Sequence, residues 1–249
     1  MNDLEISTKL NYHVSVDCVV FGFEFGHLNA LILERTMYFK EQKYIDFKLP
    51  GDLVRKDEDL DTAAARVLRE LTGLENIYLK QFAAIGTPDR LTRQERDMEW
   101  LRQIGHPEEV VVTVAYYALI NIDQDRINRF QLQEGARWIP VSLIGELAFD
   151  HNLILNDALE TLRNELRFNP IGFELLPSKF TLSQLQKLYE VIMGIELDKR
   201  NFRKKVANMP YVVPMNEKEK GVAHKPAQYY TFSKKIYNKT RKSTFDIIV

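Results

Sequence analysis

Hydrophobic positions in the first part of the chain come in short runs, rich in β-branched and aromatic residues, that favour β-strands. Residues 13–25 and 28–34 form two such runs, and the Gly-His pair at 26–27 predicts a hairpin between them. The Pro-Gly pair at 50–51 should end a third strand. Shorter strands are predicted over residues 46–49, 78–86, 110–120 and 136–140.

Between these strands the pattern predicts a helix over residues 61–71. Three consecutive alanines favour helix there, Asp59 or Asp61 can cap its start, and Gly73 ends it. The charged segment 91–106 carries a few apolar residues among its charges. We interpret this segment as an inserted helix or a lid loop.

After residue 150 the spacing of apolar residues becomes helical. Leucines recur at that spacing over residues 151–166, which predicts an amphipathic helix. The sequence Asn-Pro-Ile-Gly at 169–172 then interrupts the pattern. We therefore place a domain boundary there, with one domain over residues 1–168 and a second over 169–249.

The second domain opens with the pattern of two helices joined by a turn. Thr181 and Gln184 have the spacing of a capping box, and an apolar stripe follows over residues 182–192. The turn at 193–197 contains Gly194, which tolerates a left-handed conformation. This arrangement predicts a helix-turn-helix.

The second of these helices is basic. Asp198 should cap it, and Phe202 and Val206, four residues apart, should bury it against the first helix. Arginine suits guanine edges and lysine mainly holds phosphates, whereas Asn201 could read adenine or could stabilise the helix turn. The candidate DNA contacts on this helix are Lys199, Arg200, Asn201, Arg203, Lys204 and Lys205.

Two further strands, over residues 211–214 and 227–232, flank a basic loop at 218–225. This loop has the character of the wing of a winged helix. His224 and Lys225 at its tip are candidates for minor-groove or phosphate contacts. The alternative is a charged surface loop without a partner.

Charge is divided unevenly between the two predicted domains. The formal net charge of the chain is −1. The first predicted domain has 19 Lys or Arg and 28 Asp or Glu, which gives −9. The second has 15 Lys or Arg and 7 Asp or Glu, which gives +8. This asymmetry indicates a polyanion as partner of the second domain, although a solvated lysine-rich surface has the same composition. The 45% hydrophobic content suffices for packed cores and excludes wholesale disorder.

Other classes of protein are disfavoured by single features. Cys18 is the one cysteine, which excludes an intrachain disulfide and argues against a cysteine-based zinc site. The apolar run at 110–120 is too short to span a bilayer as a helix, and the first residues lack the pattern of a secretion signal. A cytoplasmic protein is expected.

The segment 51–74 contains a spaced set of Glu58, Arg66, Gly73 and Leu74. It resembles the Nudix box, which reads Gly-x5-Glu-x7-Arg-Glu-hydrophobic-x-Glu-Glu-x-Gly-hydrophobic. Glu58 falls at the required distance before Arg66, whereas Gly51 lies one residue too far upstream. The match indicates a box with one inserted residue in its loop.

In the Nudix box three helical carboxylates on one face hold Mg²⁺ against a diphosphate. The corresponding residues here are Val67, Glu70 and Leu71. Two are hydrocarbons that cannot coordinate a hard cation, and Glu70 lies four residues after Arg66, with which it can pair instead. Glu58 and its acidic neighbours can cap the start of the helix and complement its dipole. We therefore predict no catalytic residue, no metal and no cofactor, and thus no enzyme.

A Nudix-like fold would still retain a cleft beside the altered box. The polar loop at 86–90 is suited to hydrogen bonding with hydroxyls or phosphates, and equally to forming an ordinary tight turn. Candidate ligand-binding residues at strand ends and loops are Lys48, Asp52, Arg55, Thr87, Asp89 and Arg90.

Four strings, at 169–177, 180–182, 197–203 and 225–228, resemble the Nudix-related transcriptional regulators. The resemblance implies an α+β chain, with a Nudix-like α/β/α sandwich around a mixed sheet followed by a winged helix-turn-helix. Such regulators are usually dimers on palindromic double-stranded DNA. Some sense ADP-ribose, and others with degenerate boxes are associated with the catabolism of sugars such as arabinose.

The leading hypothesis is a repressor of a catabolic operon whose effector is a pentose or a sugar phosphate. The alternative is a Mg²⁺-dependent hydrolase of nucleoside-diphosphate compounds such as ADP-ribose. It would recruit metal through Glu58, Glu70, Glu108 or Glu109. A third possibility, an RNA-binding or scaffolding protein, lacks an exposed aromatic stacking motif.

Overall fold

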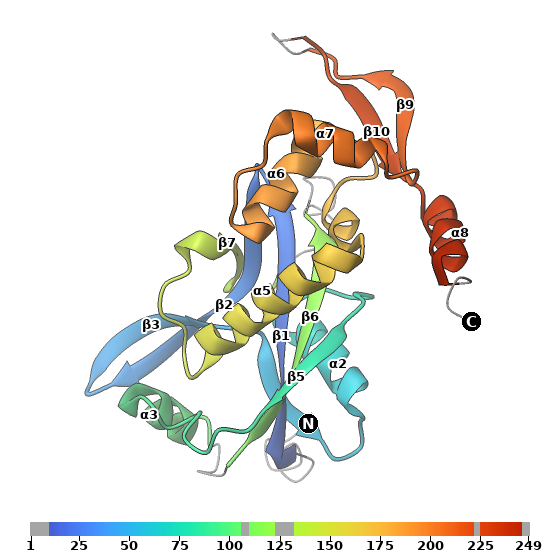
Figure 1. Ribbon diagram of the computed structural model, residues 1–249. Helices are drawn as coiled ribbons and strands as arrows, with labels where there is room; N and C mark the ends of the chain where they lie inside the picture. Colours follow the sequence, from blue (N-terminus) through green and yellow to red (C-terminus); the bar gives the residue numbers. More distant parts are fainter. Residues whose placement is uncertain (1–9, 106–109, 123–131, 222–224, 246–249) are drawn as a thin grey trace.

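The computed structural model describes residues 10–105, 110–122, 132–221 and 225–245, the last five by their backbone alone (Figure 1). Its main sheet has the strand order β3-β2-β1-β6-β5, with β4 paired to β1 and β7 paired to β2. β1 and β6 are parallel and the other pairs are antiparallel, so the predicted mixed sheet is confirmed. The strands are β1 (Leu10–Glu24), β2 (His27–Phe39), β3 (Gln42–Lys48), β4 (Gly51–Arg55), β5 (Lys80–Ile85), β6 (Val112–Asn121) and β7 (Ala136–Pro140).

Helices cover both faces of this sheet, as the sandwich prediction requires. Alternate residues of β1 point to opposite faces: Val16 packs with Ala63 and Val67 of α2 (Leu60–Thr72), whereas Phe21 lies in the core on the α5 (His151–Phe168) side. A third helix, α3 (Glu95–Gln103), lies at one end of the sheet. In the described part of the chain, no helix is both long and apolar enough to span a membrane.

The local signals for α2 are confirmed. Asp59, rather than Asp61, caps its start and accepts a hydrogen bond from the main-chain nitrogen of Thr62 at 2.7 Å. Asp61 accepts instead from the hydroxyl of Tyr116 at 2.7 Å. Gly73 ends the helix with a φ of 78°.

Strand β4 was not predicted, because the Pro-Gly pair at 50–51 was expected to end the local strand structure. The chain instead turns at Pro50 and pairs with β1, placing Gly51 opposite Asp17. A Cβ atom on Gly51 would lie 1.8 Å from Oδ1 of Asp17. Glycine therefore permits a close approach that the sequence pattern could not reveal.

The second region is a winged helix-turn-helix, and this prediction is also confirmed. Its small sheet has the order β8-β10-β9. A short turn of helix, η2 (Ile171–Leu175), leads into it. The elements that follow are β8 (Phe180–Thr181), α6 (Leu182–Met193), α7 (Lys199–Ala207), β9 (Val212–Lys218), β10 (Gln228–Phe232) and α8 (Lys234–Phe245).

The predicted helix boundaries of this region are present. Thr181 and Gln184 form the complete capping box, and Gly194 has a φ of 66° in the turn after α6. α8 was not predicted. Its Tyr237 packs against Tyr211 with ring centroids 5.4 Å apart, a contact between residues 26 positions apart that no local pattern indicates.

The buried core runs without a break from the main sheet into the winged helix. Leu162 and Leu166 of α5 belong to the same hydrophobic cluster as Phe21 of the sheet and Leu185 and Leu188 of α6. The division into domains 1–168 and 169–249 stays a prediction. Whatever the exact boundary, the two regions share one packed interior.

Candidate functional site

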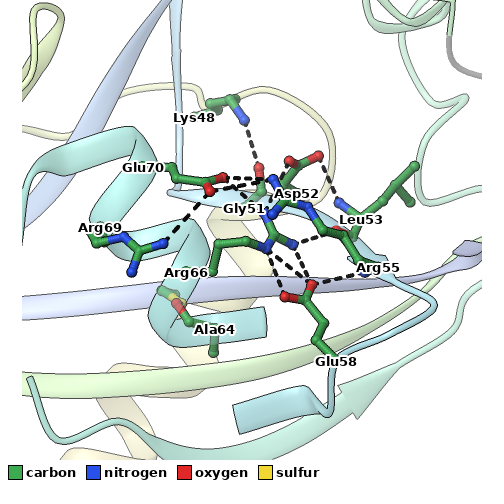
Figure 2. Close-up of polar contacts among 11 residues, drawn as sticks. Lys48, Gly51, Asp52, Leu53, Arg55, Glu58, Ala64, Arg66, Arg69 and Glu70 are labelled. Atoms are coloured by element: carbon green, nitrogen blue, oxygen red, sulfur yellow. Dashed lines mark hydrogen bonds and ion pairs between the residues drawn. The ribbon is translucent and has the colours of Figure 1, made fainter. Parts of the chain in front are cut away.

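The altered Nudix box is organised around Arg66, which Figure 2 shows between two carboxylates. Its guanidinium donates to the two oxygens of Glu58 at 2.6 and 2.8 Å and to Glu70 at 3.2 Å. It also donates to the main-chain oxygen of Leu53 at 3.0 Å. Arg55 approaches both oxygens of Glu70 at 3.3 Å. The predicted Arg66–Glu70 pair is thus present, and both box carboxylates have arginine partners.

The two hydrocarbon positions of the box differ in their surroundings. Val67 is fully buried beside Val16 and Val54, whereas Leu71 lies on the wall of a pocket. Although burial opposes it, the hydrogen bonds from Arg66 lower the pKa of Glu58 below its ordinary value. Among the residues that the structure describes, no group of three or more His, Cys, Asp or Glu side chains is placed to hold a metal ion. Glu108 and Glu109 lie outside the described residues.

The pocket beside the box has a volume of about 300 Å³. Three of the predicted ligand-binding residues, Lys48, Asp52 and Arg90, line it together. Trp100 of α3 and His151 of α5 also line it. The pocket therefore combines cations with aromatic surface, a combination suited to a ligand that carries both an anionic group and a ring.

The other predicted ligand-binding residues lie elsewhere. Arg55 lines a separate pocket of about 570 Å³ on the outer side of α2. Thr87 and Asp89 are exposed. The main-chain oxygen of Thr87 accepts from the nitrogen of Arg90 at 3.1 Å, and Asp89 pairs with Arg93 at 3.3 Å. The loop thus contains a backbone turn, from which the side chain of Arg90 reaches the pocket.

A buried charge network forms the back of the pocket. Arg90 is only 2% exposed and donates two hydrogen bonds of 3.0 Å to the carboxylate of Asp150. Its guanidinium also lies 3.3 Å from Asp17, which accepts from the hydroxyl of Thr113 at 2.6 Å. Sequence reasoning missed Asp17 and Asp150. The one available signal was a carboxylate inside the apolar run 14–23.

His151 adds a fixed neutral imidazole to this network. Its Nδ1 accepts from the main-chain nitrogen of Leu49 at 2.9 Å, so the ring proton lies on Nε2, 3.4 Å from Asp17. Burial, together with Lys48 and Arg90 nearby, lowers the pKa of His151 to about 4 against the attraction of Asp17. The ring is therefore uncharged near neutral pH.

Lys48 is the pocket's accessible cation for a ligand. Its Nζ donates to the main-chain oxygen of Gly51 at 3.0 Å and lies 5.7 Å from the ring centroid of Trp100. It forms no ion pair with another described residue. Burial lowers the pKa of Lys48, while Asp17 and Asp52 favour its charged form. An anionic ligand would supply the ion-pair partner that Lys48 lacks among the described residues.

Helix α3 closes one side of the pocket. The segment 91–106, which we interpreted as an inserted helix or a lid loop, thus contains a helix over Glu95–Gln103. Asp97 anchors it: this fully buried carboxylate accepts from Arg35 at 2.6 Å and from the main-chain nitrogen of Phe149 at 2.8 Å. The Arg35 guanidinium lies 5.1 Å from the ring centroids of both Trp100 and Phe149. Trp100 is thereby held against the pocket.

The basic helix α7 is built as predicted. Asp198 caps it by accepting from the nitrogen of Asn201 at 2.8 Å, and Phe202 and Val206 are buried. Its cations are exposed and form no ion pair with any residue that the structure describes. They are Lys199, Arg200, Arg203, Lys204 and Lys205.

The predicted DNA contacts on α7 are distributed over three hollows around the helix. Lys199 and Arg203 line a groove of about 1360 Å³ together with Lys225 beside the wing strands. Asn201 and Lys205 lie in a separate pocket on the other side of the helix. Arg200 and Lys204 line a third, shallow hollow with Lys199 and Arg203. His224 lies outside the described residues.

Comparison with known families matches both regions. Residues 11–160 match the model of the NUDIX domain, and residues 172–232 match the model described as the NrtR DNA-binding winged helix domain. The second match contains β8 to β10 together with the helix-turn-helix. The exposed cations of α7 thus lie in the part of the chain that matches a DNA-binding family.

Individual relatives match most of the length of the chain. One relative is the ADPR responsive transcriptional repressor NtrR of Acinetobacter baylyi, to which the chain is 33% identical over 229 residues. The match covers 90% of this chain and 84% of the relative. Its structure is similar to Shewanella oneidensis NrtR complexed with a 27mer DNA, with a TM-score of 0.67, 25% identity and coverage of 88% and 93% of the two chains. A MutT/nudix family protein from Enterococcus faecalis, at 19% identity, shares the fold with a TM-score of 0.62 over 94% of each chain.

Proposed function

The chain belongs to the family of regulators that join a Nudix domain to an NrtR-type winged helix, and we propose that it is a transcriptional repressor that responds to ADP-ribose. The observation that carries the DNA-binding half is the exposed cationic surface of α7, which forms no ion pair with any described residue. Five cations on one short helix repel one another and gain most from a polyanion. The winged helix presents them in the way that suits a major groove.

ADP-ribose replaces the sugar effector that the loss of the box carboxylates had led us to expect. The relative from Acinetobacter baylyi is named for its response to ADPR rather than to a sugar. The pocket supports the change, because Lys48 can pair with a diphosphate and Trp100 offers a surface for a ring. A free pentose carries no phosphate to pair with Lys48 and no aromatic ring to stack on Trp100.

We propose further that the protein does not hydrolyse this ligand. Support comes from the hydrocarbons Val67 and Leu71 at two metal-ligand positions and from the pairing of Glu58 and Glu70 with arginines. A carboxylate already held by a guanidinium loses that pairing when it binds a metal. Binding without turnover leaves the ligand available as a signal.

The effector proposal is tested by titrating the purified chain with ADP-ribose, arabinose and ribose 5-phosphate in a thermal-shift assay. ADP-ribose at a hundred times its Kd should add about 2.7 kcal/mol to the stability of the folded state. Lys48→Met should weaken that binding about tenfold or more, while the exposed Lys43→Met serves as the matched control. Stabilisation by arabinose but not by ADP-ribose would refute the proposal.

DNA binding and its response are measured on a duplex selected from a random pool by the protein itself. Fluorescence anisotropy should give a nanomolar to tens-of-nanomolar Kd at physiological salt, and ADP-ribose should change it. Because palindromic sites match two-fold symmetric proteins, we propose a homodimer on DNA, which sedimentation of the complex measures. A complex of one chain per duplex contradicts the dimer alone.

Hydrolysis is tested with Mg²⁺ and ADP-ribose by following the release of AMP. We expect no turnover above that of a protein-free reaction. Turnover that disappears in Glu70→Gln would instead favour the hydrolase, with Glu70 as a metal ligand.

A further inference from the structure

Helix α5 begins at the pocket and ends against the helix-turn-helix. We propose that α5 is the connection through which a ligand in the pocket acts on α7, and that Arg163 is the positioning residue that makes this connection at the DNA-binding end. This inference rests on the proposed function, because it assigns the route by which ADP-ribose binding changes DNA binding.

The first turn of α5 is fixed to the pocket wall. Asp150, the residue before the helix, uses its carboxylate to hold Arg90 through two 3.0 Å hydrogen bonds rather than to cap the helix. The next residue, His151, lines the pocket and accepts from the main-chain nitrogen of Leu49. Phe149 also lines the pocket and adopts a φ of 58°. A ligand that shifts these residues therefore acts on the start of α5.

Between its two ends α5 is a continuous rod. It has 18 residues, which corresponds to a length of about 27 Å. Its buried face, which includes Ile154, Ala158 and Leu162, lies in the same hydrophobic cluster as Leu185 and Leu188 of α6. Close-packed interiors transmit displacement rather than absorb it. A displacement of α5 at the pocket end is therefore transmitted to α6.

Arg163, near the far end of α5, contacts the turn that precedes α7. Its Nε donates to the main-chain oxygen of Ile192 at 2.7 Å, in the last turn of α6. That oxygen belongs to the set that a helix cannot pair within itself. The guanidinium also lies beside Gly194, where a Cβ atom would be 3.6 Å from Nη2. Arg163 therefore joins the sensor region to the end of α6 by a specific hydrogen bond.

The turn itself is rigidly joined to α6, so that α7 follows α6. The carboxylate of Glu190 accepts a hydrogen bond from the main-chain nitrogen of Leu197 at 3.1 Å. The side chain of Gln186 donates to the main-chain oxygen of Leu197 at 2.8 Å. Asp198, the next residue, caps α7. A shift that Arg163 imposes on the end of α6 is consequently carried to the cations of α7. A ligand that prefers one position of α5 then selects one position of α7.

The test compares Arg163→Ala with Glu165→Gln, a matched change on the same helix. Glu165 forms a 2.6 Å ion pair with Lys80 of the sensor sheet and lies on the sensor side of α5. For each protein the DNA Kd is measured with and without saturating ADP-ribose, and the ADP-ribose Kd with and without DNA. The two ratios must agree within one protein, because coupling between sites is reciprocal.

In the wild type and in Glu165→Gln we expect ratios of about 5- to 150-fold, the usual range for coupled sites. In Arg163→Ala both ratios should fall below about twofold, while the Kd for each ligand alone stays within about threefold of wild type. Arg163→Lys, which keeps a donor, should restore part of the ratio. Undiminished ratios in Arg163→Ala would overturn the proposal.

A second measurement separates this inference from the proposed function. If the wild type binds DNA but not ADP-ribose, the effector assignment fails, and a double-mutant cycle without ligand decides the coupling. His151→Asn, which keeps an acceptor for Leu49 but loses the contact with Asp17, perturbs the start of α5. Introduced into the wild-type protein, His151→Asn should change the Kd for DNA about fivefold or more. Introduced into Arg163→Ala, the same substitution should change that Kd less than twofold. Effects that multiply independently would overturn the connection.

Discussion

The two charged regions of this molecule use the same residue types for opposite purposes. Behind the pocket, Arg90 is buried and surrounded by Asp17 and Asp150 at hydrogen-bonding distance. On α7, Arg203 and its neighbours are exposed and lack ion-pair partners among the described residues. Buried charges must be paired, because desolvation is costly, whereas exposed charges are kept unpaired at little cost. The buried network behind the pocket stabilises the fold, whereas the exposed cations of α7 are available to bind a partner.

The difference predicts where removing a charge affects folding and where it affects binding. A buried pair that loses one member leaves an uncompensated charge in the interior. An exposed cation that is removed changes the interaction with DNA and leaves the fold intact.

Arg90→Met should cause the largest loss of stability, about 3–5 kcal/mol, because Asp17 and Asp150 then stay buried without a cation. Chemical denaturation measures the free energy of unfolding. Arg93→Met removes an exposed arginine that pairs with Asp89 on the surface, and it should cost no more than about 1 kcal/mol. Equal losses in the two variants would remove the distinction between the regions.

Stability should also decline as the pH falls from about 6.5 to 4. His151 keeps a pKa of about 4 in the folded chain, so in this window the unfolded chain binds a proton that the folded chain does not. The contribution is full above the unfolded pKa, is lost as the pH approaches 4, and amounts to roughly 3 kcal/mol. Asp17, whose pKa is lowered in the folded chain, affects the pH dependence of stability only below its ordinary pKa of 3.8.

His151→Asn should flatten the dependence of the unfolding free energy on pH between pH 4 and 6.5, which urea denaturation at several pH values measures. An unchanged slope in that variant, with the exposed His27→Asn as reference, would contradict the assignment.

Arg203→Ala should weaken binding to the selected duplex by about 1–3 kcal/mol while the unfolding free energy stays within about 0.5 kcal/mol of wild type. Lys187→Ala is the matched control, since Lys187 is exposed on α6 and lies beside Gly26 of the sensor region. Anisotropy titrations compare the two variants. Wild-type affinity in Arg203→Ala would show that Arg203 does not contact DNA.

The smallest effect concerns salt. Lys204→Gln should lower the slope of log K against log[salt] by about 0.9 if Lys204 holds one phosphate, with little change in preference among sequences. Titrations at several salt concentrations measure the slope. A change in base preference with an unchanged slope would instead assign Lys204 to base recognition.

Much of the fold could be predicted because its signals are local. Asp59, Thr181, Gly194 and Asp198 are helix boundary residues whose roles follow from neighbours within a few positions. The pocket was predicted only in part. Lys48, Asp52 and Arg90 were identified because they lie at strand ends and in loops expected to face the box, whereas Asp17, Trp100, Asp150 and His151 come from distant segments.

By itself, the sequence determined most strands and helices, although not β4 or α8, together with the loss of two box carboxylates and the concentration of positive charge after residue 168. These are properties of composition and short-range spacing. Only the tertiary structure decided which charges are neutralised: Arg90 meets Asp17 across 73 positions and Asp150 across 60, whereas the cations of α7 meet no described acid. Pairing and burial depend on which segments the sheet brings together, and that cannot be read from either segment alone.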